Sequence, residues 1–115
     1  MLFRSDINIQ TTLPAATGSG LELLTKEGKW IALDEGPNSI VVNVGDMLQM
    51  FTQHLASIGK LPKEKVLRST THRVVATGDE RFSMPFFFHP RSEVNLGPMT
   101  AGEYLMQRLR EIGLA

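Results

Sequence analysis

The feature that most constrains the fold of this 115-residue chain is a series of short β-branched and aromatic runs, each followed by a turn rich in glycine, proline or polar residues. Runs of this kind, spaced by turn signals, are typical of an antiparallel sandwich or barrel. A glycine-bearing turn at 26–29 predicts a hairpin. Segment 47–55 fits a strand or a short helix equally well, because its periodicity does not decide between them. The expected strands cover residues 7–13, 21–25, 30–33, 39–44, 66–76 and 81–88.

One helix is predicted at the C-terminal end of the chain. Thr100 and Glu103 have the spacing of a capping box, in which each residue satisfies an amide at the start of a helix. Leu105, Leu109 and Ile112 then form one apolar stripe at helical spacing. We therefore expect a single, mainly β domain over residues 1–115 that ends in a helix over 100–113.

Charge and composition exclude several classes of protein. The chain has 12 basic and 12 acidic side chains, so it lacks the basic excess of a nucleic-acid or anionic-membrane binder. No apolar run approaches the ~18 residues of a membrane span, and the polar start does not resemble a secretory signal. Without cysteine there is no disulfide, thiolate ligand or cysteine nucleophile. We expect a cytoplasmic protein that binds neither nucleic acid nor membrane.

His72 is the histidine whose surroundings suggest chemistry. It lies in the run STTHRVV, where a strand would put its ring on the same face as Thr70 and Val74. A histidine on the inner face of a barrel needs a polar partner or a metal. Most single histidines are nevertheless ordinary surface or packed residues. His54 and His89 lie beside loop-like segments, and the sequence gives no comparable argument for them.

Arg81 and Ser83 form the second candidate group. Two residues apart in a strand, they would share one face, and a guanidinium beside a hydroxyl suits a carboxylate ligand. The alternative is a surface arginine that pairs with Asp79 or Glu80. Asp6 could serve as a metal ligand, although an isolated aspartate is more often a solvated turn residue.

The order of the motifs along the chain carries a family resemblance. The segments are SDIN, LPAATGSGLELLTKEGKWIAL, SIVVNVGDMLQMFT, STTHRVV and RFSMPFFFHP. Together they resemble the C-terminal part of the iron(II)- and 2-oxoglutarate-dependent oxygenases, in the bacterial form of the isopenicillin N synthase-like branch. The resemblance runs from about Asp6 to Pro90, and the ending TAGEYLMQRLREIGL also fits. It implies an incomplete double-stranded β-helix, or jelly-roll, because the family has further helices and strands before this region.

The resemblance also implies a site and an activity. The family binds iron through two histidines and one carboxylate, which leave the other face of the metal open. Its pattern places metal ligands on Asp6 and His72, and a carboxylate-binding Arg-x-Ser motif on Arg81 and Ser83. That carboxylate belongs to 2-oxoglutarate in most members, and to the substrate in isopenicillin N synthase. The implied function is oxidation of a small-molecule substrate coupled to oxidative decarboxylation of 2-oxoglutarate.

One residue departs from the family pattern. Arg4 stands where the first histidine ligand is expected, and arginine has no lone pair for a metal. The third ligand would then come from His54, His89 or a neighbouring chain, and the one sequence feature that singles out His54 is its place in a stretch, 54–67, that looks longer than the corresponding family loop. The alternative is an inactive remnant that serves as a binding or interaction module. A metal-free lectin-like or cupin-like jelly-roll would explain the strands, but not the combination of His72 with Arg81 and Ser83.

An incomplete jelly-roll has consequences for its surface. Missing strands would leave unpaired sheet edges, and missing helices would leave apolar surface uncovered. We therefore expect a homo-oligomer formed through exposed sheet edges, or pairing with a missing segment. Leu23, Met84 and Phe86 are candidates to line the barrel interior, with an ordinary core role as the alternative.

Overall fold

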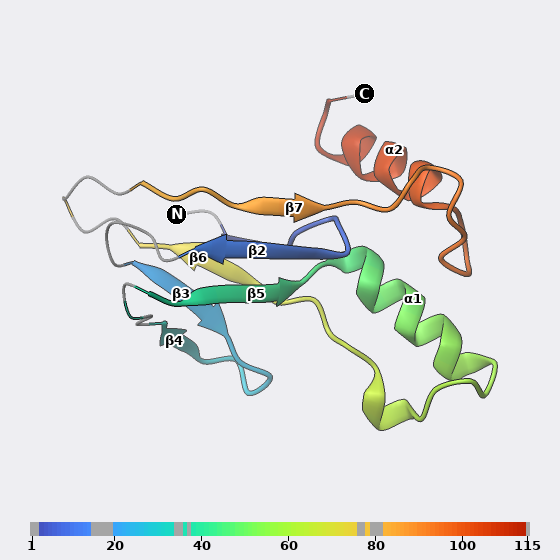
Figure 1. The fold of residues 1–115 in the computed structure, drawn as a ribbon, viewed down its shortest axis with the longest axis horizontal. Helices are drawn as coiled ribbons and strands as arrows, with labels where there is room; N and C mark the ends of the chain where they lie inside the picture. The colour runs from blue at the N-terminus through green and yellow to red at the C-terminus, as the bar shows by residue number, and fades with distance from the viewer. Residues whose placement is uncertain are drawn as a thin grey trace.

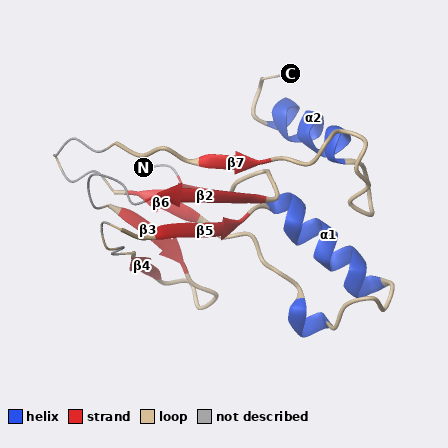
Figure 2. Cartoon of the chain, viewed as in Figure 1, coloured by secondary structure: helices blue, strands red, loops and turns tan. Residues whose placement is uncertain are grey.

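Two antiparallel sheets with two helices at one end make up the fold (Figure 1). The computed structural model describes residues 3–14, 20–33, 36, 38–75, 78 and 82–114. The helices are α1 (Asp46–Ser57) and α2 (Ala101–Glu111), with one 3-10 turn, η1 (Lys63–Lys65). Figure 2 shows the two helices beyond the same end of the strands. In spatial order, one sheet holds β1 (Phe3–Arg4), β6 (His72–Val74), β3 (Leu21–Leu24) and β4 (Trp30–Ala32), and the other holds β5 (Ile40–Val44), β2 (Gln10–Pro14) and β7 (Phe86–Phe88).

Strand register brings one set of side chains to the inner face of each sheet. In the four-stranded sheet, Leu23 lies opposite His72. In the three-stranded sheet, Thr11 lies opposite both Asn43 and Phe87. Because side chains alternate along a strand, these residues share a face with those two positions away. Residues from both sheets line one cavity, which we call the sheet cavity, of ≈ 140 Å³.

The outer face of the four-stranded sheet carries a polar group that helps to fix its register. Arg73 lies opposite Glu22, and its Nη2 approaches the Glu22 Oε1 to 2.7 Å. The same guanidinium stacks 3.9 Å from the ring centroid of Trp30, in a cation–π geometry. With Arg73 held on the outer face, the alternation of the strand turns its neighbour His72 inward.

Segment 47–55, which fits either a strand or a helix by its pattern, belongs to helix α1. Gly45 is the N-cap and offers no side-chain cap. Instead, the amides of Gly45, Asp46 and Met47 donate to backbone carbonyls of segment 6–9 at 2.7–3.1 Å. The first amides of a helix need external acceptors. Here those acceptors come from a segment nearly forty residues upstream, so no local cap marks the helix start in the sequence.

The main buried cluster lies where the helices meet this loop, and not between the sheets. Ile7 and Ile9 pack against it from segment 6–9, and Phe51 packs against it from α1. Packing of these apolar side chains anchors the loop on which Asp6 stands. The buried members of the cluster are Met47, Leu96, Ala101 and Tyr104.

The strands expected over 7–13 and 66–76 are shorter in the structure. Residues 7–9 cap α1 and the strand begins at Gln10. Residues 66–69 run along α1, where the amide of Leu67 donates to Thr52 Oγ1 and that of Ser69 donates to Gln49 Oε1. Thr70 and Thr71 make backbone hydrogen bonds to Val44 and Leu24, and β6 itself is limited to His72–Val74.

The C-terminal segment forms α2, with Thr100 as its N-cap. The Thr100 Oγ1 accepts a hydrogen bond from the amide of Glu103 at 3.2 Å. The expected strand over 81–88 is also shorter, because β7 covers Phe86–Phe88 and Arg81 lies outside the described residues. Within the described ranges, no helix is long and apolar enough to cross a membrane.

Candidate metal centre

Asp6 and His72 come together at one end of the sheet cavity. The His72 Nε2 lies 3.7 Å from the Asp6 Oδ1, and the two side chains are 15% and 11% exposed, respectively. Asp6 stands in the loop between β1 and β2, and His72 is the first residue of β6. The structure therefore pairs the two residues for which the family resemblance predicts a metal-binding role.

Backbone and side-chain hydrogen bonds both hold Asp6. Its backbone carbonyl accepts from the amide of Asp46, at 2.7 Å, at the start of α1. Its Oδ2 accepts from Thr11 Oγ1 at 2.6 Å and from Asn43 Nδ2 at 2.9 Å. Both donors lie in the three-stranded sheet. The carboxylate is consequently held by hydrogen bonds to its Oδ2, and its Oδ1 faces His72.

The ring of His72 is oriented through its other nitrogen. Its Nδ1 lies 3.1 Å from the carbonyl oxygen of Thr70. A carbonyl only accepts, so in this hydrogen bond Nδ1 carries the proton, and the lone pair of the neutral ring is then on Nε2. That is the tautomer in which Nε2 can bind a metal.

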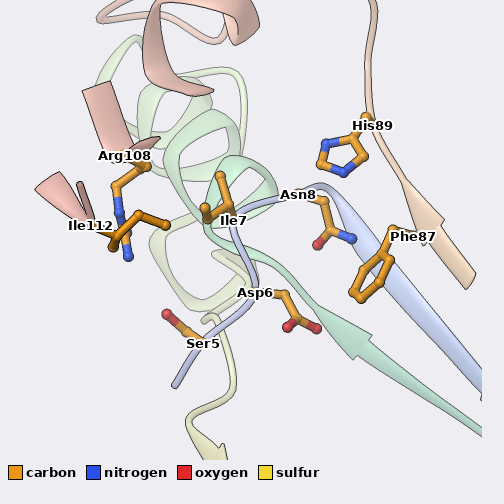
Figure 3. Close-up of a pocket in the computed structure, with 8 residues that line it drawn as sticks. All are labelled: Ser5, Asp6, Ile7, Asn8, Phe87, His89, Arg108 and Ile112. Carbon is orange, nitrogen blue, oxygen red and sulfur yellow. The ribbon is translucent and has the colours of Figure 1, made fainter. Parts of the chain in front are cut away.

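A second and larger hollow begins on the other side of Asp6. This helix cavity has a volume of ≈ 360 Å³ and is lined in part by Arg108 of α2 (Figure 3). Figure 3 shows Arg108 and Ile112 on one side of Asp6, and Phe87 and His89 on the other. Asp6 lines both cavities, so a group bound to its carboxylate would be reachable from the interior and from the helical end.

The Asp6 and His72 pair fits a metal as two of its ligands. Donor atoms about 2.1 Å from one metal ion, at angles between 90 and 120°, lie roughly 3.0–3.6 Å apart. The observed separation of 3.7 Å is just beyond the upper end of that range. Arg4 pairs with His72 across β1 and β6. Among the residues that the structure describes, no three His, Asp or Glu side chains cluster closely enough to hold a metal.

The two other histidines do not complete such a cluster. His54 lies in the last turn of α1 and packs against Gly97, and neither cavity beside Asp6 includes it. His89 does line the helix cavity, although its side chain is exposed. The proposal that His54 supplies a third ligand therefore lacks support in the fold.

The structure describes one of the two residues that are predicted to bind a carboxylate. Ser83 lines the sheet cavity together with Asp6 and His72, whereas Arg81 lies outside the described residues. Leu23 lines this cavity as expected. The expectation for Met84 and Phe86 was wrong, because their side chains are 78% and 61% exposed. In β7 it is Phe87, opposite Thr11, that faces inward, so alternation turns Phe86 outward.

A polar network next to the loop of Asp6 was missed from sequence. Asp46 Oδ2 accepts from Arg108 Nη1 at 2.8 Å, from Ser5 Oγ at 3.2 Å and from the Tyr104 hydroxyl at 3.4 Å. Burial raises the pKa of Tyr104 above its ordinary value of 10.0, although the hydrogen bond from Arg108 opposes this rise. The network ties α2 to the first turn of α1. No local pattern indicates it, because Asp46 and Arg108 are 62 residues apart.

Thr11 and Asn43 were also missed as parts of the site. A sequence signal for Asn43 does exist, since it is the polar residue inside the β-branched run IVVNV. A buried polar side chain in such a run needs a partner. Thr11, which is 3% exposed, looks like an ordinary strand residue.

Known proteins share both sequence and fold with this chain. The family model of the 2OG-Fe(II) oxygenase superfamily matches residues 4–90. Gibberellin 2-beta-dioxygenase 5 of Oryza sativa subsp. japonica is 33% identical over 111 residues, which cover 84% of this chain and 29% of that protein. The chain spans less than a third of the length of the curated relatives compared.

Solved structures agree with this assignment. A 2OG-Fe(II) oxygenase family protein from Caulobacter crescentus matches with a TM-score of 0.75 at 34% identity, over 96% of this chain and 39% of that one. JOX2, in complex with 2OG, Fe and JA, matches with a TM-score of 0.70 over 91% of this chain and 32% of that one, and at 24% identity it shows the fold alone. The mainly β, jelly-roll architecture is thereby confirmed, and the chain belongs to the 2OG-Fe(II) oxygenase superfamily, whose cofactors are iron(II) and 2-oxoglutarate.

Proposed function

We propose that this chain carries two protein ligands of an iron(II) centre, Asp6 and His72, and a 2-oxoglutarate carboxylate site, Arg81 and Ser83. The whole protein would oxidise a small molecule while it decarboxylates 2-oxoglutarate. The observation that carries this proposal is the 3.7 Å approach of His72 Nε2 and Asp6 Oδ1 beside a cavity between two sheets. A relative named as a gibberellin dioxygenase supports a small-molecule substrate.

The residues of the chain would bind, orient and protect the reacting groups. Asp6 Oδ1 and His72 Nε2 would hold the iron, which when bound supplies the redox chemistry with oxygen. Arg81 and Ser83 would pair with the far carboxylate of 2-oxoglutarate, in the two-point geometry that favours arginine at such sites. The apolar side chains of the sheet cavity would exclude water and thereby strengthen these polar contacts. They include Leu13, Leu21, Leu23, Val41 and Val74.

Arg4 favours a second candidate function. Its strand position lies opposite His72, where the family pattern has a histidine, and its guanidinium has no lone pair for a metal. A chain with two ligands would bind iron weakly or not at all. On this alternative, the domain is a non-catalytic binding or interaction module that keeps the fold of the family.

An anaerobic titration with Fe(II) and 2-oxoglutarate, followed by the visible charge-transfer band of the chelate, tests the two candidates. Arg4→His is run alongside, with His72→Ala as the negative control. A band in the unaltered chain that is lost in His72→Ala supports the oxygenase site. A band only in Arg4→His supports the non-catalytic module. No band in either folded protein would contradict the assignment of Asp6 and His72 as ligands within this chain.

The carboxylate site is tested in the same assay. Ser83→Ala and Arg81→Met should each raise the concentration of 2-oxoglutarate needed for half of the band, because each removes a donor to its far carboxylate. Direct Mn(II) binding in the absence of 2-oxoglutarate should remain unchanged in both variants. Equal 2-oxoglutarate dependence in all three proteins would remove Arg81 and Ser83 from the proposal.

A further inference from the structure

We infer that Thr11 and Asn43 are positioning residues, which hold Asp6 so that only its Oδ1 is available to a metal. This inference rests on the proposed function, and it assigns roles to two residues that the sequence did not single out. Neither residue is itself a ligand: both act through hydrogen bonds to the other carboxylate oxygen of Asp6.

The hydrogen bonds to Asp6 are unequally divided between its two oxygens. Oδ2 accepts from Thr11 Oγ1 at 2.6 Å and from Asn43 Nδ2 at 2.9 Å. Oδ1 faces His72 Nε2 across 3.7 Å. Two donors occupy the lone pairs of Oδ2, so this oxygen is not free for a cation. A metal between Asp6 and His72 would thus be bound by one carboxylate oxygen, and its other coordination positions would stay open.

The Thr11 hydroxyl is also held by a third residue. Asn8 Nδ2 donates to Thr11 Oγ1 at 3.1 Å and to the carbonyl of Gln10 at 3.0 Å. Asn8 and Thr11 are 1% and 3% exposed, so solvent does not compete. Because a carboxylate oxygen only accepts, the single hydroxyl hydrogen of Thr11 goes to Asp6, and the hydroxyl oxygen is left to accept from Asn8. The buried contacts of Thr11 therefore orient its hydroxyl group to donate to Asp6.

The two donors, Thr11 and Asn43, are cross-strand neighbours in one sheet. Thr11 in β2 lies directly opposite Asn43 in β5, and their side chains share the inner face. Asp6 itself stands in a loop, which moves more readily than a strand. The sheet thus holds the loop carboxylate in place, as outer hydrogen-bond partners do for metal ligands in general. Such support matters most where few protein ligands are present, and Arg4 leaves this site with two.

Mn(II) binding tests the inference without any need for turnover. Its dissociation constant is measured by electron paramagnetic resonance of the free ion, for the unaltered chain, Thr11→Val, Thr11→Ser and Asn43→Ala. Thr12→Val is the matched control, because Thr12 is the next residue of β2 and faces the opposite side. All variants are also melted without metal, so that a general loss of folding is seen separately.

We expect Thr11→Val and Asn43→Ala to weaken Mn(II) binding about 10–100-fold, the range seen when outer partners of metal ligands are removed. Thr11→Ser keeps the hydroxyl and should bind within a few-fold of the unaltered chain, as should Thr12→Val. The visible spectrum of the Co(II)-loaded protein should also change in Thr11→Val and Asn43→Ala, because a released Oδ2 alters the coordination of the metal. A purely structural role would shift melting without this spectral change.

The outcomes separate this inference from the proposed function. Equal Mn(II) affinity of Thr11→Val, Asn43→Ala and Thr12→Val overturns the inference and leaves the proposed function intact. Absence of Mn(II) binding in both the unaltered chain and Arg4→His overturns the two together. If Thr11→Val does not fold, Asn43→Ala against Thr12→Val carries the same comparison.

Discussion

Gly45 lies so close to Asn8 that a Cβ at residue 45 would overlap the backbone oxygen and the side-chain Oδ1 of Asn8. The backbone of Gly45 has φ −96°, an angle open to any residue. Lack of space, and not backbone conformation, therefore requires glycine here. The contact holds segment 6–9 against the first turn of α1, where the Asp46 amide donates to the carbonyl of Asp6. Gly45 thus helps to place a metal-ligand candidate that it does not touch.

Gly45→Ala should destabilise the fold and weaken metal binding. Forcing a methyl group into this contact should lower the free energy of unfolding by about 1–3 kcal/mol, as overpacking usually does. Gly36→Ala is the matched control, because a Cβ there meets nothing within 4 Å. Urea unfolding measures both variants. Equal stability of the two would mean that segment 6–9 is not held by this contact.

Tyr104 should make stability depend on alkaline pH. Burial raises its pKa in the folded state above 10.0, so the folded chain holds this proton more tightly than the unfolded chain does. The resulting contribution to stability is fully present below pH 10.0, and it is lost as the pH rises through the higher folded pKa. Tyr104 is the only tyrosine of the chain, so tyrosinate absorbance reports its titration directly.

Two comparisons check the assignment to Tyr104. The titration midpoint of tyrosinate should lie higher in native than in urea-unfolded protein. Tyr104→Phe should reduce the loss of stability above pH 10.0, because the remaining loss comes only from other groups. A native midpoint at or below that of the unfolded protein would show that the hydroxyl is not buried beside Asp46.

Thr100→Ala should weaken α2 at its first turn. The variant leaves the Glu103 amide without its side-chain acceptor, so the free energy of unfolding should fall by about 1 kcal/mol. Thr100→Ser keeps the acceptor and should remain close to the unaltered chain. Chemical unfolding of the three proteins gives the comparison. A Thr100→Ala variant as stable as Thr100→Ser would mean that the cap contributes nothing measurable.

The outer face of the three-stranded sheet should promote self-association. Ile40, Val42 and Phe86 on this face are 63%, 58% and 61% exposed, and β5 and β7 are the edge strands. Exposed apolar surface beside open edges favours pairing between chains. We expect light scattering to show a mass that rises with protein concentration, and Val42→Thr with Phe86→Thr to reduce that rise.

Ile58→Thr is the control for this prediction, because Ile58 is 51% exposed but lies at the end of α1, away from the sheet. It should associate like the unaltered chain. A mass that stays monomeric at every concentration would contradict the predicted homo-oligomer.

The two helices differ in how far sequence could predict them. Thr100 and Glu103 mark α2 because its first amides are capped by a residue of the same segment. Helix α1 has no such mark, since its cap is made of carbonyls from segment 6–9. A helix whose ends are satisfied locally can be predicted from local spacing. A helix whose cap is supplied by a distant segment can be assigned only once the chain has folded.

The candidate site also combines features that sequence predicts with features that only the folded chain shows. Sequence by itself determined the strand character of the chain at His72, the resemblance that pairs it with Asp6, and the absence of a ligand at Arg4, because these depend on residue type and spacing along the chain. Only the tertiary structure decided that Thr11 and Asn43 hold one oxygen of Asp6, that Phe87 and not Phe86 faces the cavity, and that Arg108 meets Asp46. The first two depend on which strands pair and in what register, and the third depends on how α2 packs against α1; a single sequence does not specify such long-range contacts.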